Sequence, residues 1–101
     1  MKNEIREKGL TVYGHIVRCT DFRAGSPYEE FPFKTRIRLE GITGDMIPTV
    51  IFGAEEVESG NFADIACAVE GGVDIYARRI PDGDVLLSAI MVVPQKRTEA
   101  Q

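Results

Sequence analysis

Cysteine and histidine are scarce in this sequence, which has two cysteines and one histidine among 101 residues. Cys19 and Cys67 are too few and too far apart for the disulfide framework of a small secreted protein, so we expect both to be small buried hydrophobic residues. His15 has no cysteine or carboxylate at metal-ligand spacing, and we expect it to be structural, with no metal bound. The sequence also lacks a glycine-rich phosphate loop, a serine elbow and a paired cysteine and histidine. We therefore expect neither an enzyme nor a cofactor.

Long apolar segments are also missing. The longest apolar run, Ala89 to Val93, has the length of a strand and falls well short of the roughly 18 residues that suggest a membrane-spanning helix. The opening MKNEIREKGL is charged and has no apolar core like that of a signal peptide, so we expect a cytoplasmic protein. The length suits one globular domain, which we place at residues 10–93, between an N-terminal segment at 1–9 and a polar tail at 94–101.

Positive charge is absent from the middle of the chain. No Lys or Arg occurs from Leu39 to Ala77, whereas eight of the sixteen acidic residues lie there. The rest of the chain therefore has eight acidic against twelve basic residues, a net charge of +4, although the whole chain has a net charge of −4. We expect a basic surface formed by the segments on either side.

Alternation of apolar and polar residues predicts three strands, and two short runs rich in β-branched and other apolar residues predict two more. They cover residues 10–19, 33–40, 46–52, 73–77 and 85–93. The segment 21–32 contains glycine, serine and two prolines, so we expect a long loop there. The turn at 41–45 predicts a hairpin between the second and third strands, and Asp82-Gly83 predicts another between the last two strands.

A change of period after Gly53 predicts one helix. Phe62, Ile65, Ala66 and Val69 follow the spacing of an amphipathic helix, which Ser59 or Asn61 would begin and Gly71-Gly72 would end. Three strands, a helix and a final hairpin match the OB-fold, a five-stranded Greek-key barrel in the all-β class.

The OB-fold places its ligand across the second and third strands, between two loops. The outward side of residues 33–40 would carry alternating cations, and the flanking segments would add further cations and rings. These predicted contacts are Arg23, Lys34, Arg36, Arg38, Arg78 and Arg79 for phosphates, and Tyr28 and Phe31 for bases. Cations that neutralise phosphates, combined with rings that stack on bases, are what single-stranded nucleic acid requires.

Three short motifs resemble the bacterial-type single-stranded DNA-binding proteins. Leu10, Val12 and Gly14 match a Leu-x-Val-x-Gly opening, VIFGAEE at 50–56 resembles the end of the third strand and the start of the helix, and EGGVDIY at 70–76 resembles the entry to the fourth strand. The resemblance extends over residues 10–93. It implies binding of single-stranded DNA rather than RNA, with little sequence preference.

The resemblance also implies roles for individual residues. Phe52 would stack on a base, so Met46, Pro48 and Val50 would face outward with it, and Ile47, Thr49 and Ile51 inward. The chain has no tryptophan, has a short hairpin loop at 80–84, and shows no acidic, aromatic-ended tail. These departures imply weaker binding, a smaller footprint and a small phage-, plasmid- or conjugative-element protein that supports replication, recombination or DNA transfer.

A second interpretation is an OB-fold interaction module, a subunit or adaptor that uses the same face to bind a protein. The net charge of −4 and the absence of tryptophan favour it. In either case the first and fifth strands would leave open edges, so we expect a homodimer or a higher homo-oligomer.

Overall fold

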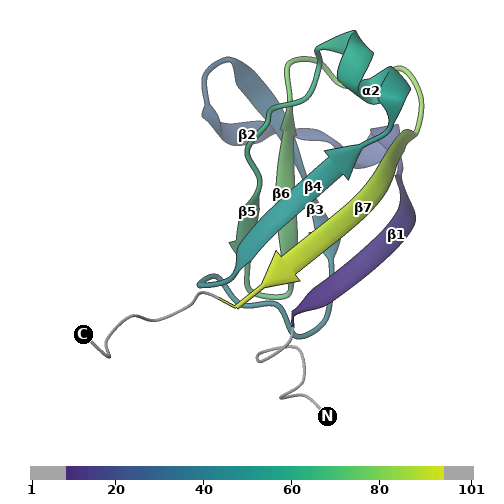
Figure 1. Ribbon diagram of the computed structural model, residues 1–101. Coiled ribbons are helices and arrows are strands. Elements are labelled where there is room, and N and C mark those ends of the chain that lie inside the picture. Colours follow the sequence, from purple (N-terminus) through teal and green to yellow (C-terminus); the bar gives the residue numbers. More distant parts are fainter. Residues whose placement is uncertain (1–8, 95–101) are drawn as a thin grey trace.

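The computed structural model describes residues 9–94 and has the strand-rich architecture expected of the all-β class, with one short α-helix (Figure 1). The elements in order are β1 (Leu10–Val17), the 3-10 helix η1 (Cys19–Asp21), β2 (Arg23–Tyr28), β3 (Phe31–Arg38), β4 (Ile47–Phe52), α2 (Ala54–Ser59), β5 (Cys67–Val69), β6 (Gly72–Ala77) and β7 (Val85–Val93). The five predicted strands correspond to β1, β3, β4, β6 and β7.

The strands form two antiparallel sheets, in the orders β1-β7-β4 and β2-β3-β6-β5. Figure 1 shows the three-stranded sheet in front of the four-stranded one. Leu87 and Ile90 from the first sheet and Ile37 and Ile75 from the second belong to the same buried core cluster. Each sheet therefore has one side that packs on the core and one side that faces outward. The two outward sides face in opposite directions.

Both predicted hairpins are wrong. β3 pairs with β6 and β4 pairs with β7, so the second and third predicted strands lie in different sheets, as do the last two. The predicted loop at 21–32 contains β2, which occupies the other edge of β3. β7 lies between β1 and β4, so the fifth predicted strand has no open edge. Within residues 9–94, the strand pairings do not join the two sheets into a closed barrel.

An irregular register explains why β2 is hard to recognise in the sequence. Arg23 pairs with Lys34, whereas Tyr28 pairs with Phe31, so the register shifts between the two ends of β2. Gly25 lies in this shift with a φ of 125°, a conformation that favours glycine. Local patterns of loop residues do not separate a bulged edge strand from a loop.

The helix begins at Ala54, where the resemblance places it, and ends at Ser59, followed by Gly60, whose φ of 69° is left-handed. The helix predicted over residues 62–69 is therefore wrong. Glu55 and Glu56 lie in the first turn of α2, where negative charge is favourable, and Glu56 Oε2 accepts a hydrogen bond of 2.9 Å from the Leu86 amide. This bond joins the helix to β7.

After Gly60 the chain is held in an extended path rather than a helix. The Asn61 side chain accepts a hydrogen bond from the Arg79 amide at 2.9 Å and donates one to the Arg79 carbonyl at 3.0 Å. Phe62 forms an isolated bridge with Ala77, and residues 67–69 become β5. Of the apolar residues at helical spacing, Phe62 and Ala66 pack against the core, whereas Ile65 is 46% exposed, so the spacing does not correspond to one buried side.

The structure describes no helix between residues 9 and 94 that is long and apolar enough to cross a membrane. The segments predicted at 1–9 and 94–101 lie almost entirely outside the described residues.

Candidate nucleic-acid interface

Four cationic side chains project from the outer side of the four-stranded sheet. Alternation along β3 turns Lys34, Arg36 and Arg38 outward, because Thr35 and Ile37 between them are only 5% and 3% exposed. The predicted orientation of this strand is confirmed. Arg23 pairs directly with Lys34, so it lies on the same side of the sheet. We call Arg23, Lys34, Arg36 and Arg38 the cationic face.

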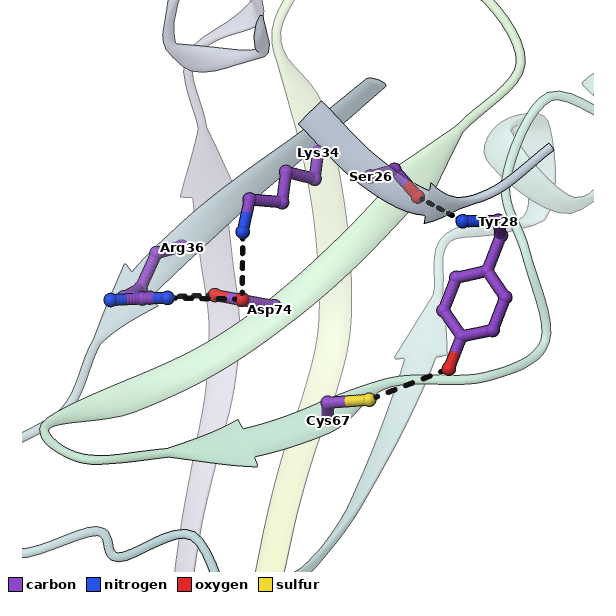
Figure 2. Close-up of polar contacts among 6 residues, drawn as sticks. All are labelled: Ser26, Tyr28, Lys34, Arg36, Cys67 and Asp74. Atoms are coloured by element: carbon purple, nitrogen blue, oxygen red, sulfur yellow. Dashed lines mark hydrogen bonds and ion pairs between the residues drawn. The ribbon is translucent and has the colours of Figure 1, made fainter. Parts of the chain in front are cut away.

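A buried carboxylate lies in the cationic face. Asp74 pairs with Arg36 across β3 and β6, and the residue is 3% exposed. Arg36 Nε donates to Asp74 Oδ1 at 2.7 Å and Arg36 Nη2 to Oδ2 at 3.2 Å, while Lys34 Nζ is 3.5 Å from Oδ2 (Figure 2). The hydrogen bond to Asp74, with the attraction of its charge, raises the pKa of Arg36. Two cations thus share one negative charge, and the cationic face stays net positive.

The sequence pattern did not assign Asp74 to the site. Its position on the same side of β6 as Tyr76 follows from alternation, but its contact with Lys34 and Arg36 depends on the pairing of β3 with β6. That pairing is long-range and has no local signal in the sequence. Asp74 is therefore a residue of this surface that the sequence alone could not place there.

Tyr28 borders the cationic face. Its ring packs edge-on against Tyr76, with centroids 4.9 Å apart, and its hydroxyl lies 3.8 Å from Cys67 Sγ (Figure 2). The contact with Cys67 raises the pKa of Tyr28, and burial is the main cause of the raised pKa of Tyr76. Tyr28 is half-buried, whereas Tyr76 beneath it is only 2% exposed. Of the two rings, Tyr28 is the one that a ligand can reach.

Phe31 and Arg78 lie in a groove that also includes Tyr28. The Arg78 guanidinium covers the Phe31 ring at 4.6 Å from its centroid, and its Nε donates to the Gly60 carbonyl at 3.0 Å. Acidic residues line the same groove, namely Glu29, Glu30 and Asp64. Arg78 is therefore engaged within the protein, next to the cationic face rather than within it.

Arg79 lies in a different place. It lines a second pocket, between α2 and the loop joining β6 to β7, together with Glu55 and Asp84. The structure thus brings four of the six predicted cations onto one face, places Arg78 in the adjoining groove, and leaves Arg79 apart.

The orientation predicted for β4 is wrong. Phe52 stacks on Phe62 with centroids 4.9 Å apart and packs against the core, as does Val50. Met46 is 7% exposed, whereas Ile51 is 45% exposed. The reason is the pairing with β7, which sets Val50 opposite the fully buried Ile90. Phe52 belongs to the inner side of the other sheet and does not contribute to the cationic face.

No family model, curated protein or solved structure matches this chain. Among residues 9–94, no three His, Cys, Asp or Glu side chains are grouped so that they could hold a metal ion.

Proposed function

We propose that the cationic face binds the phosphate backbone of single-stranded nucleic acid, with little sequence preference and with DNA favoured over RNA. The observation that carries this proposal is that two adjacent strands direct four cations to one face that contains a single carboxylate in contact with them. Outward residues of a strand are about 7 Å apart, so the three cations of β3 extend over roughly 14 Å. A surface of this length can contact more than one phosphate.

The ion pairs with Asp74 leave hydrogen-bond donors for a ligand. A guanidinium has five N–H donors and an ammonium has three, and Asp74 engages only part of them on Arg36 and Lys34. The carboxylate also holds both side chains in place, so less side-chain entropy is lost when a phosphate binds. Arg23 and Arg38 are exposed, and we assign them the largest share of the binding energy.

Tyr28 supplies the stacking surface in this proposal. Base stacking on aromatic rings tolerates any sequence, and it also uses arginine planes such as the one that covers Phe31. A strand that crosses the cationic face would meet Tyr28 first and then the groove of Phe31 and Arg78. The acidic residues of that groove limit how far the phosphate backbone extends into it.

We also propose that the fold is a distant variant of the OB-fold. The order of the long strands, with a helix between β4 and β6, supports this relation. The added strand β2 and the pairing of β3 with β6 would be the features that opened the barrel into two sheets.

The test is a fluorescence anisotropy titration of labelled oligo-dT and of a duplex of equal length, at two salt concentrations. We expect preference for the single strand and a slope of log affinity against log salt of roughly −3, because each of four contacts contributes about −0.7. Arg23→Glu/Arg38→Glu should lose at least about tenfold in affinity, since both cations are exposed and neither contacts Asp74. This pair avoids placing new carboxylates against Asp74.

The matched control is Arg18→Glu/Arg79→Glu, which makes the same change in charge outside the four-stranded sheet, at the residue between β1 and η1 and in the pocket beside α2. We expect it to retain most of the affinity. Equal losses in both double variants, or binding that does not change with salt, would contradict the proposal. Failure to bind any oligonucleotide, together with salt-insensitive binding of a protein, would favour the interaction module instead.

A further inference from the structure

The outer side of the three-stranded sheet is a second surface. Glu56 of α2 lies at one end of it, where its carboxylate accepts the hydrogen bond from the Leu86 amide, but the strands themselves have no charged residue. β1, β4 and β7 contain no Asp, Glu, Lys or Arg. Six of the nine large hydrophobic residues that are exposed within the described chain lie on these three strands. They are Tyr13, Ile16, Ile47, Ile51, Leu86 and Val93. We call these six residues the apolar face.

Strand pairing arranges the apolar face in rows across the sheet. Ala89 of β7 pairs with Tyr13 on one side and with Ile51 on the other, which gives one row across the sheet. Val93 pairs with Ile47 in a further row, and Ile16 pairs with Leu86 near the other end. The row of Thr11, Met91 and Thr49 lies between the first two of these rows, and Ser88 lies beside Ala89, so uncharged hydroxyl groups separate the hydrophobic residues. Single exposed hydrophobic residues are ordinary, but several that lie close together without a charged residue on the same strands indicate an interaction site.

The size of the patch fits a weak, specific contact. Three strands about 4.8 Å apart and about 30 Å long give a flat footprint of roughly 400 Å², at the scale of the largest apolar patches on monomers. Stable interfaces cover about 800 Å² per partner, so this face alone supplies about half of that area, which is the size of a weak, transient contact. We therefore expect a dissociation constant in the micromolar range rather than the nanomolar range.

We propose that the occupant is a second copy of this chain, docked through the same face about a two-fold axis. A two-fold contact brings a surface against itself, so any charge on it would meet like charge. The apolar face avoids this cost except at the Leu86 end, where Glu56 lies, because its strands contain no Asp, Glu, Lys or Arg, although the chain has a net charge of −4. A partner that relied on charge complementarity would find nothing to pair with here.

This dimer is compatible with the cationic face. The two sheets enclose the core, so the apolar face and the cationic face lie on opposite sides of the molecule (Figure 1). Dimerisation would cover one and leave the other open on each protomer. The proposed dimer does not depend on nucleic-acid binding, and its test uses no nucleic acid.

The test is sedimentation velocity of the full chain between about 1 µM and about 500 µM, a range that brackets a micromolar dissociation constant. The mass should rise with concentration from 11.2 kDa toward twice that value. Ile51→Glu and Ile51→Lys should both remain monomeric, because a two-fold contact would bury the new charge of each protomer. The matched control is Val57→Glu. Val57 lies on α2, outside the three-stranded sheet, and is 65% exposed, so this variant should dimerise like the wild type.

Thermal unfolding separates loss of the contact from loss of the fold. The wild-type melting temperature should increase with protein concentration. The Ile51 variants should unfold cooperatively, with a melting temperature that does not depend on protein concentration. A wild-type chain that stays monomeric throughout, even if another protein binds it, overturns the proposal. A dimer that both Ile51 variants leave intact also overturns it, since the contact would then lie elsewhere, for example at a strand edge.

Discussion

The two sheets of this protein are alike on the inside and different on the outside. Both turn buried aliphatic residues toward one core. On the outward side, the four-stranded sheet has four cations and the carboxylate of Asp74, while the strands of the three-stranded sheet have no Asp, Glu, Lys or Arg. The core requirement fixes every second residue of a strand and leaves the others free. The net charge of the chain is therefore a poor guide to the charge of either outer surface.

The largest expected effect is on the free energy of unfolding. It compares a residue on the inner side of the three-stranded sheet with a residue on its outer side. Ile90→Ala should lower the free energy of unfolding by about 2–5 kcal/mol, because the residue is fully buried. Ile51→Ala should lower it by less than about 1 kcal/mol in dilute, monomeric protein, because Ile51 is 45% exposed. Urea unfolding at low protein concentration measures both. Similar losses would mean that Ile51 is not on an open surface.

A smaller effect tests what Asp74 does on the cationic face. Asp74→Asn should increase affinity for oligo-dT several-fold and make its salt dependence steeper by about one phosphate contact, because the charges of Lys34 and Arg36 are no longer shared. Asp82→Asn makes the same change in charge in the loop between β6 and β7 and should have little effect. Weaker binding by Asp74→Asn would show that the carboxylate itself contacts the ligand.

The smallest effect is alkaline destabilisation from the tyrosines of the four-stranded sheet. The pKa values of Tyr28 and Tyr76 are raised above their ordinary value of 10.0. Above that pH the unfolded chain loses protons that the folded chain retains, so the free energy of unfolding should fall as pH rises from about 10 toward the folded-state values. Urea unfolding at about pH 8 and about pH 10.5 measures the fall. It should be smaller in Tyr76→Phe, and an unchanged fall would assign it to other groups.

The cationic stripe of β3 was predictable because alternation within a strand is a local property. Five strands were predicted near their observed positions because alternation and short apolar runs are both local properties of the sequence. β2 was missed because its glycine, serine and proline residues resemble a loop, and the hairpins were wrong because strand pairing is decided by contacts remote in sequence. The contact of Asp74 with Lys34 and Arg36 was missed for the same reason, because it depends on the pairing of β3 with β6. The resemblance placed the start of α2 correctly at Ala54, but the orientation it implied for Phe52 was inverted.

The apolar face shows the same limit of local patterns. Ile47 and Ile51 were expected to face inward because the resemblance placed Phe52 outward, yet they are 48% and 45% exposed. β4 is apolar on both sides, so its composition does not indicate which side meets the core. Only the pairing with β7 decides this.

The central claim is that the cationic face is where single-stranded nucleic acid binds. Titrating the ¹⁵N-labelled protein with oligo-dT and following each backbone amide by NMR tests it most directly. The account predicts that the shifts concentrate in β2, β3 and β6, around Arg23, Arg36 and Arg38, and leave the outer side of β1, β7 and β4 unchanged. Shifts centred on β1, β7 and β4, or no shifts at an oligonucleotide concentration that saturates a micromolar site, would contradict it.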